Sequence, residues 1–360
     1  MRIPSLTIGH LTAHLPIVQG GMGVGISMSG LAGAVAQAGG IGVISAVGIG
    51  FYRPDINVDK VKANIKAIQE QLQLARQKAP KGILGVNIMV AIREFDELVR
   101  ASINAGADII FAGAGLPTDL PSLVGNSKVL LAPIISSAKA ATVICRAWAK
   151  RYSYTPDAIV LEGPLAGGHL GFSVEELEEG HGKDLSTLLQ EVLAAVAPFE
   201  EASGKTIPVI AGGGVWSGAD IASLLKQGAS GVQMATRFVT TVECDASLKF
   251  KEAYLNAQGP EDLMIIRSPV GMPGRALANQ FLKMVSQGAT IPNHCDYTCL
   301  KTCKPAEAPY CIANVLIAAQ KGEFEHGFAF AGANAWRCKE IVTVQALMDE
   351  LAAEIEEVPA

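Results

Sequence analysis

The sequence lacks the features that mark membrane and nucleic-acid proteins. No run of about 18 uninterrupted apolar residues occurs in the chain, which excludes a typical membrane-spanning helix. Only 29 Lys and Arg residues stand against 34 Asp and Glu, and a net charge of -5 disfavours the basic surface that nucleic acids or anionic lipids require. The start MRIPSLTIGH has no positively charged segment followed by an apolar one, so we expect no secretory signal and a cytoplasmic location. The expected partner is a small molecule, with no nucleic acid and no membrane.

Two common nucleotide-binding motifs are also missing. The glycine-rich segment GGMGVGISMSG at 20–30 contains no G-x-G-x-x-G. HGKD at 181–184 lacks the first glycine of a P-loop, which belongs five positions before Gly182, and the Ser or Thr after the lysine. Their absence disfavours an open doubly wound sheet, which remains the second choice of fold.

Eight short apolar runs predict buried strands of a parallel sheet, because helical patterns separate them. The expected helices span 59–78, 94–104, 138–151, 184–197 and 218–227. The strand candidates are 16–20, 41–46, 83–90, 108–113, 129–135, 158–163, 208–214 and 231–238.

Eight βα units in about 240 residues are typical of a closed (β/α)₈ TIM barrel. We therefore expect an α/β protein with a barrel over residues 1–242. The segment 243–322 has a different composition, and we interpret it as a small C-terminal helical subdomain that carries a cysteine cluster. The last segment, 323–360, is expected to return and pack on the barrel.

Glycines gather where the predicted strands end. Gly21 follows the first strand, Gly168 the sixth, and Gly213 and Gly214 the seventh. In a barrel these positions meet at one mouth, where glycine lets several backbone N–H groups approach a ligand. Each glycine alone is explained equally well by a tight barrel corner. Three clusters at three strand ends favour a bound, phosphate-bearing cofactor.

His169 is the single histidine at a predicted strand end, in the sequence LEGPLAGGHLGF. Glycines on both sides leave the imidazole beside bare backbone, which favours function over core packing. Such a histidine acts as a general acid or base, or donates a hydrogen bond to developing negative charge. Asn87 and Gln233 add neutral hydrogen-bonding groups at neighbouring strands. The mouth has no nucleophile elbow and no acidic metal cluster, which favours redox chemistry on a cofactor.

Six ordered motifs resemble one known family. The chain is similar to the nitronate monooxygenase (2-nitropropane dioxygenase) family, which includes FMN-dependent enoyl-acyl-carrier-protein reductases, over most of residues 14–240. The resemblance continues more weakly through RALANQF and AGANAW. The motifs are QGGM at 19, AGGIG at 38, GVNIM at 85, AGGHLG at 166, AGGG at 211 and GVQMATRF at 231.

The resemblance implies a barrel that binds FMN, with His169 as the catalytic residue. In nitronate oxidation this histidine would assist electron transfer or deprotonation while the flavin reoxidises on O₂. In an enoyl reductase it would orient the thioester carbonyl while NAD(P)H supplies the hydride through FMN. The cofactor-binding residues expected are Gly21, Met22, Asn87 and Gly168 at the ring, Gly213, Gly214, Ala235 and Thr236 at the phosphate, and Gln233 at the mouth.

The choice of reaction stays open. The motif GPLAGGHLGF favours a nitronate monooxygenase, whereas PIVQGGMG, ANQF and AGANAW favour the NAD(P)H-dependent enoyl or enone reductases. The substrate is accordingly a small nitronate or an acyl thioester, and a homodimer is one candidate assembly. A rival from another class is a non-redox barrel that binds a phosphorylated metabolite.

The segment CDYTCLKTCKPAEAPYC departs from the family pattern. It places Cys295, Cys299, Cys303 and Cys311 within 17 residues, and the first three follow a spacing of four along one helical face. One hypothesis is that the four cysteines bind a metal, either an iron–sulfur cluster or a zinc ion. Ordinary buried thiols or a disulfide pair are the alternatives.

Overall fold

Eight parallel strands close into a barrel, as the sequence predicts. The computed structural model describes residues 1–178, 182–291, 295 and 298–359. Around the barrel the order is β10-β11-β3-β4-β5-β6-β7-β8, so strands that follow one another in sequence are neighbours. The strands are β3 (Ile17–Gln19), β4 (Ile41–Ser45), β5 (Ile83–Met89), β6 (Ile109–Gly113), β7 (Leu130–Ile135), β8 (Ile159–Glu162), β10 (Val209–Gly212) and β11 (Gly231–Met234).

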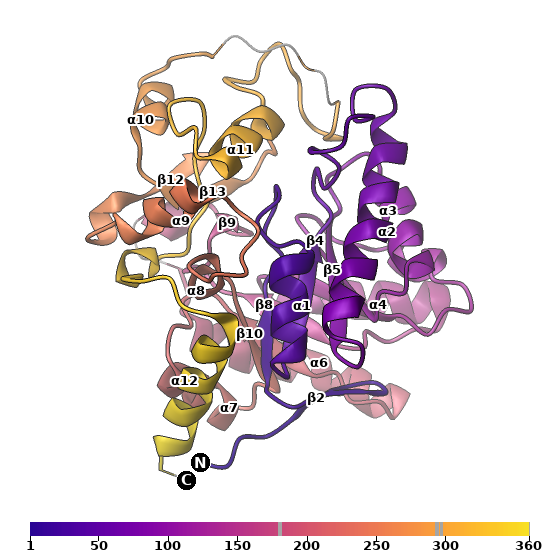
Figure 1. Cartoon of the computed structure of the whole chain (residues 1–360). Helices are drawn as coiled ribbons and strands as arrows, with labels where there is room; N and C mark the ends of the chain where they lie inside the picture. The colour runs from indigo at the N-terminus through magenta and orange to yellow at the C-terminus, as the bar shows by residue number, and fades with distance from the viewer. Residues whose placement is uncertain (179–181, 292–294, 296–297, 360) are drawn as a thin grey trace.

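Helices surround the barrel, and the ribbon views show them outside the strands (Figure 1). The strands β4, β6 and β10 are buried along their whole length, because side chains alternate between the barrel interior and the helix layer. The helices that follow barrel strands are α1 (Ser29–Gln37), α2 (Lys60–Lys78), α3 (Phe95–Asn104), α4 (Ala138–Tyr152), α5 (Val174–Glu178), α6 (Leu185–Ser203), α7 (Gly218–Lys226) and α8 (Thr236–Val239), with the 3₁₀ turn η1 (Leu120–Leu123) before β7.

Side-chain caps start several of these helices. The carboxylate of Asp59 accepts from the N–H of Lys62, and that of Asp184 accepts from Thr187. Ser217 and Asp220 form a reciprocal capping box at α7. These caps account for the starts of α2, α6 and α7, which agree with the predicted starts to within one residue.

A short hairpin precedes the barrel. It joins β1 (Leu6–Ile8) to β2 (Leu11–Ala13) in antiparallel register. Leu6 and Ile8 are buried in the same cluster as Val18 and Ile41, at the N-terminal ends of the strands. The hairpin therefore covers the barrel end opposite the site.

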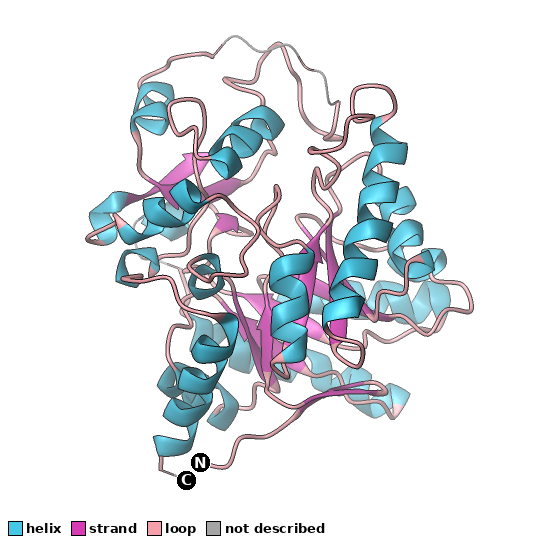
Figure 2. Cartoon of the chain, viewed as in Figure 1, coloured by secondary structure: helices cyan, strands magenta, loops and turns pink. Residues whose placement is uncertain are grey.

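The segment after the barrel contains helices, as expected, and it also contains two strands that the sequence analysis did not predict. Strands β12 and β13 pair with each other, and β13 also pairs with β9, which lies between β8 and α5 in the chain (Figure 2). This antiparallel sheet was missed because it is completed by a partner about 100 residues earlier in the chain. The elements are β9 (Gly168–His169), α9 (Leu248–Leu255), η2 (Pro260–Asp262), β12 (Leu263–Arg267), β13 (Pro273–Leu277), α10 (Gln280–Ser286) and α11 (Ile312–Lys321).

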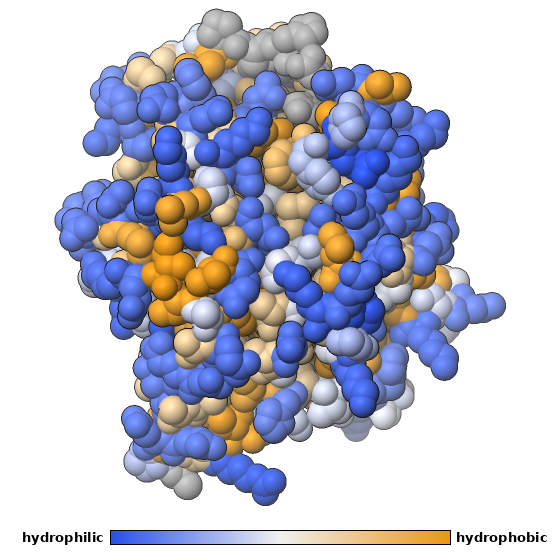
Figure 3. All heavy atoms as spheres, in the orientation of Figure 1, coloured by the Kyte–Doolittle hydropathy of each residue, from blue (hydrophilic) through white to orange (hydrophobic). Residues whose placement is uncertain are grey.

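The last segment returns to the barrel. After η3 (Ala335–Arg337), helix α12 (Val344–Glu357) packs against α7 and α1. Its residues Leu347, Leu351 and Ile355 are buried in one cluster with Ile221 of α7. Hydrophilic side chains cover most of the face in Figure 3, with hydrophobic side chains gathered near α8 and α9. Among the described residues, no helix has the length and hydrophobicity needed to cross a bilayer.

Candidate active site

A cavity of about 230 Å³ opens at the carboxyl ends of the barrel strands. The closed parallel topology brings these ends together, although the residues are distant in sequence. Every predicted catalytic and cofactor-binding residue lines this cavity. They are Gly21, Met22, Asn87, Gly168, His169, Gly213, Gly214, Gln233, Ala235 and Thr236.

One side of the cavity is rich in backbone donors. The N–H groups of Gly213, Gly214, Ala235 and Thr236 make no hydrogen bond with any described residue. Gly213 and Gly214 both have positive φ, at 100° and 90°, a conformation that glycine adopts without strain. Neighbouring N–H groups in such a turn form a concave site for an anion. This side of the cavity therefore suits a phosphate.

Close packing requires a glycine opposite Asn87. A Cβ atom placed on Gly21 would lie 2.4 Å from the Cβ of Asn87, far inside a normal contact. The Asn87 amide makes no hydrogen bond with a described residue, and it lies at the end of β5 on the cavity wall. An amide in this position is available to a ligand.

His169 lies on β9, outside the barrel sheet. It pairs with Gly274 of β13, so the appended sheet fixes the backbone of the catalytic candidate. Its Nε2 lies 2.8 Å from the Oγ of Ser268, and the ring of Phe330 packs against the imidazole at a centroid distance of 4.8 Å. Ser268 and Phe330 were not predicted from the sequence.

The imidazole is neutral near pH 7. Burial lowers the pKa of His169 to about 4, because the charged form would lose its water. The Ser268 hydroxyl has no other acceptor among the described residues, so we assign it as the donor to Nε2. This assignment places the remaining ring proton on Nδ1. The ring then offers a hydrogen-bond donor to a ligand.

Arg275 holds the loop that precedes His169. Its Nη1 donates to the carbonyl oxygens of Pro164 and Ala166, at 2.7 and 2.6 Å. The side chain is buried without a carboxylate partner in the described residues, and burial lowers its pKa. Its function here is to satisfy two carbonyls of the AGGH turn.

Glu162 is a site residue that the sequence analysis missed. It ends β8 and lines the cavity without a hydrogen bond to any described residue. Burial raises the pKa of this carboxyl to about 8, so it is mostly protonated at pH 7 and able to donate a hydrogen bond. The available signal was a charged residue at the end of the apolar run AIVLEG.

The chain after the barrel also lines the cavity. Asn334 donates to the carbonyl of Gly214 at 2.7 Å, and the N–H of Gly332 donates to the Oγ1 of Thr236 at 3.3 Å. Trp216 also lines the cavity, and the guanidinium groups of Arg237 and Arg337 lie 5.1 and 4.8 Å from the centroid of its ring. The motif AGANAW was noticed as part of the resemblance, but nothing in the sequence placed it at the site.

The four cysteines lie apart from the donor-rich side. Cys299 and Cys303 pack against the main hydrophobic cluster, and none of the four is in a disulfide. Burial, with the Cys311 and Cys295 thiols nearby, raises the pKa of Cys299 to about 12. Among the described residues, no three His, Cys, Asp or Glu side chains are arranged to hold a metal ion. The metal site therefore stays a prediction.

Comparison with known proteins connects this site to one family. The family model described as nitronate monooxygenase matches residues 5–354. A relative named probable nitronate monooxygenase, from Staphylococcus saprophyticus, is 24% identical over 322 residues, which cover 82% of this chain and 84% of the relative.

A second relative and a solved structure extend the likeness. The (3aS,4S,5R,7aS)-5-hydroxy-7a-methyl-1-oxo-octahydro-1H-indene-4-carboxyl-CoA dehydrogenase of Mycobacterium tuberculosis is 29% identical over 274 residues. That match covers 76% of this chain but only 66% of the dehydrogenase, just under two thirds of its length. The structure of FabK from Thermotoga maritima superposes with a TM-score of 0.73 at 27% identity, covering 96% of this chain and 94% of FabK.

Proposed function

The chain belongs to the nitronate monooxygenase family of flavin-dependent oxidoreductases, and we propose that it uses FMN to oxidise alkyl nitronates with O₂. The observation that carries the proposal is one cavity that holds a neutral histidine and a set of unpaired backbone donors. The first group suits an anionic substrate, and the second suits a cofactor phosphate.

The residues present fit FMN. The unpaired N–H groups of Gly213, Gly214, Ala235 and Thr236 would hold the phosphate. Gly21, Met22, Asn87, Gly168 and Gln233 would surround the ring, with the Asn87 amide free to bond to its polar edge. FMN would supply the electron-accepting ring that none of the protein side chains provides.

His169 would bind and orient the substrate. With Ser268 donating to Nε2, the Nδ1 proton would be left to donate a hydrogen bond to a nitronate oxygen. A neutral ring in a buried site avoids the cost of a second charge while it still stabilises the anion. Phe330 limits how far the ring can rotate, which keeps that donor in place.

A spectrum and an assay test the proposal. The purified protein is expected to be yellow, to release FMN on denaturation, and to consume O₂ when an alkyl nitronate is added. His169→Ala is expected to retain the flavin and to lose turnover by at least about 100-fold. A colourless protein that cannot be reconstituted with FMN would refute the proposal.

An NAD(P)H-dependent enoyl thioester reductase is the second candidate. It is favoured by the likeness to a carboxyl-CoA dehydrogenase and by the neutral lining of the cavity, because His169 would also donate to a thioester carbonyl. Anaerobic reduction of the flavin by NADH or NADPH, followed by reoxidation with an enoyl thioester, distinguishes this reaction from nitronate oxidation. Reduction by the nitronate itself supports the first candidate.

Two further hypotheses, a non-redox barrel and a metal bound by the four cysteines, have simple tests. A non-redox barrel would use the same N–H groups for a phosphorylated metabolite, and it predicts a protein without bound flavin. A metal at Cys295, Cys299, Cys303 and Cys311 predicts stoichiometric iron or zinc in protein purified without oxygen, and an iron–sulfur cluster adds a broad visible absorption.

A further inference from the structure

A second cavity of about 70 Å³ adjoins the first, and we name it the tail chamber. The two cavities share four lining residues, which are Val47, Met89, His169 and Leu316. These shared residues form the boundary between the two cavities, so a ligand whose reacting end lies at His169 is directly adjacent to the tail chamber.

The walls of the tail chamber are mainly aliphatic, with Ile92, Val270 and Ile312 among them. Its buried polar residue, Asn64, is already engaged. The Asn64 Oδ1 accepts from the N–H of Gly50 at 2.8 Å, and its Nδ2 donates to Glu94 at 2.9 Å. Lys60 and Glu94 also line the chamber, and Glu94 is the acceptor of the Asn64 amide. Most of the remaining wall is hydrocarbon, which favours an apolar group over a charged one.

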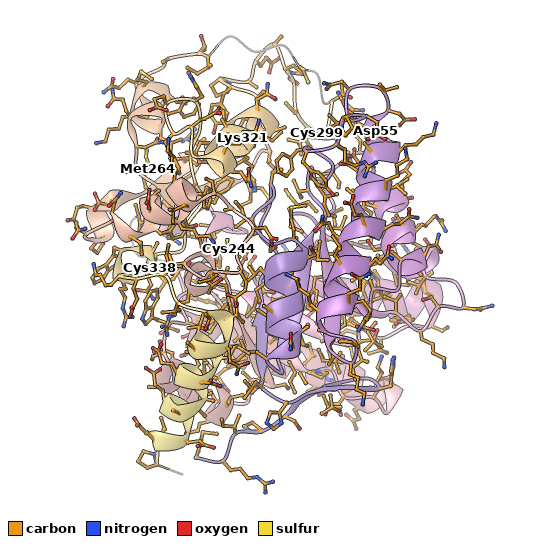
Figure 4. The ribbon with its side chains drawn as sticks, viewed as in Figure 1. Asp55, Cys244, Met264, Cys299, Lys321 and Cys338 are labelled. Carbon is orange, nitrogen blue, oxygen red and sulfur yellow. The ribbon has the colours of Figure 1, made fainter. Side chains whose placement is uncertain are left out.

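One wall comes from the cysteine segment and is fixed to the barrel. The N–H of Arg93 donates to the carbonyl of Cys299 at 2.9 Å, and Arg93 Nε donates to the carbonyl of Leu300 at 3.1 Å. Leu300 also forms a bridge with Ile92 in the loop after β5. Figure 4 shows Cys299 beside this end of the barrel helices. A wall held at several points sets a definite limit on ligand length.

The volume gives that limit. A protein cavity of about 150 Å³ holds one benzene ring of six carbons, so a chamber of about half that volume holds about three. We propose that the tail chamber binds the alkyl tail of the substrate and selects tails of about three carbons beyond the reacting carbon. This inference rests on the proposed function, because it takes His169 as the residue at the reacting end.

Binding of unreactive analogues tests the inference without turnover. Linear alkyl carboxylates resemble nitronates as planar anions with an alkyl tail, and propionate, pentanoate and heptanoate would place about one, three and five carbons in the chamber. On flavin-loaded protein, calorimetry is expected to give a Kd about 15-fold lower for pentanoate than for propionate, since each buried methylene contributes about fourfold. Heptanoate is expected to bind no better than pentanoate.

Two variants change the chamber in opposite directions. Ala313→Phe fills it from α11, so pentanoate should lose its advantage over propionate, whose single carbon in the chamber loses least. Leu300→Ala enlarges it while the backbone contacts with Arg93 remain, so the optimum should move to heptanoate. Asn314→Phe adds the same ring at an exposed position of the same helix and should leave the series unchanged.

The outcomes separate this inference from the proposed function. A protein that binds no flavin refutes the proposed function and the inference with it. Two results would refute the tail chamber alone in a flavin-loaded protein that turns over nitronates. The first is a set of Kd values that does not depend on tail length. The second is a change of the Kd series by Asn314→Phe as large as the change by Ala313→Phe. An unshifted optimum in folded Leu300→Ala protein refutes it as well.

Discussion

Replacing Glu162 by glutamine tests whether the cavity keeps a carboxyl group protonated. Burial raises the pKa of Glu162 to about 8, and no described residue bonds to its side chain. Glutamine has nearly the same shape and cannot ionise. The change therefore removes the titration while it preserves the packing at the end of β8.

The direction in which the free energy of unfolding changes with pH follows from the pKa of Glu162 in the folded and unfolded chain. The unfolded carboxyl loses its proton near pH 4.5 and the folded one near pH 8, so stability is full at low pH and falls as the pH rises between these values. The slope is about 1.4 kcal/mol per pH unit for one proton. Glu162 alone would thus lower the free energy of unfolding by about 2 kcal/mol between about pH 6.5 and pH 8.

His169 has the opposite effect at lower pH. The pKa of His169 is lowered from 6.5 to about 4, so between these pH values the unfolded chain binds a proton at this residue and the native state does not. Stability that is present above pH 6.5 is lost as the pH falls toward about 4. From about pH 4.5 to 6.5 the two slopes nearly cancel, and above pH 6.5 the Glu162 term acts alone.

Urea unfolding of flavin-free protein at several pH values measures these slopes. The native sequence should lose about 2 kcal/mol from about pH 6.5 to 8, and Glu162→Gln should remove most of that loss. His169→Asn should extend the falling slope down to about pH 4.5. Glu201→Gln, at an exposed position on α6, serves as the control. Equal slopes for the native protein and Glu162→Gln would refute the reasoning.

Three further changes test the parts that support the site. Ser268→Ala removes the 2.8 Å bond to His169 and should lower kcat about 10- to 100-fold with flavin retained and KM little changed, in steady-state assays. Gly21→Ala places a Cβ 2.4 Å from that of Asn87 and should weaken FMN binding at least tenfold by fluorescence titration, whereas unchanged affinity would contradict the packing argument. Arg275→Lys ends one bond short of the position of Nη1, which donates to both carbonyls, so the variant should lose about 2 kcal/mol of stability by urea unfolding, with native stability as the contrary result.

The barrel was predictable because its signals are local. Apolar runs such as AIVLEG end where turn residues begin, and the residues between them carry helical patterns with capping side chains. The end of α6 shows the limit of such signals. Pro198 suggested a stop after residue 197, but the helix continues to Ser203 and ends before Gly204, at φ 66°. Packing of the amphipathic helix on the barrel outweighs the one N–H that proline lacks.

The appended sheet was not predictable for the opposite reason. Strand β13 is completed by β9, and a two-residue strand at Gly168 carries no periodic pattern of its own. Ser268 and Phe330 reach His169 only through this long-range docking. Sequence reasoning thus found most of the residues at the barrel strand ends, although it missed Glu162 at the end of β8. It also missed Ser268 and Phe330, which the later chain places beside His169.

This division has a functional consequence. The barrel strand ends carry the residues that we propose to bind FMN. The later chain supplies Ser268 and Phe330 beside His169, and it supplies Leu300 in the wall of the tail chamber. Gly21→Ala, at the proposed FMN site, should therefore lower mainly the affinity for flavin. Leu300→Ala, in the wall of the tail chamber, should change mainly the tail length that binds best. His169 belongs to both parts, since it lines both cavities and its strand is paired with the appended sheet. Related barrels could then change substrate by altering the appended segment while they keep the same cofactor residues.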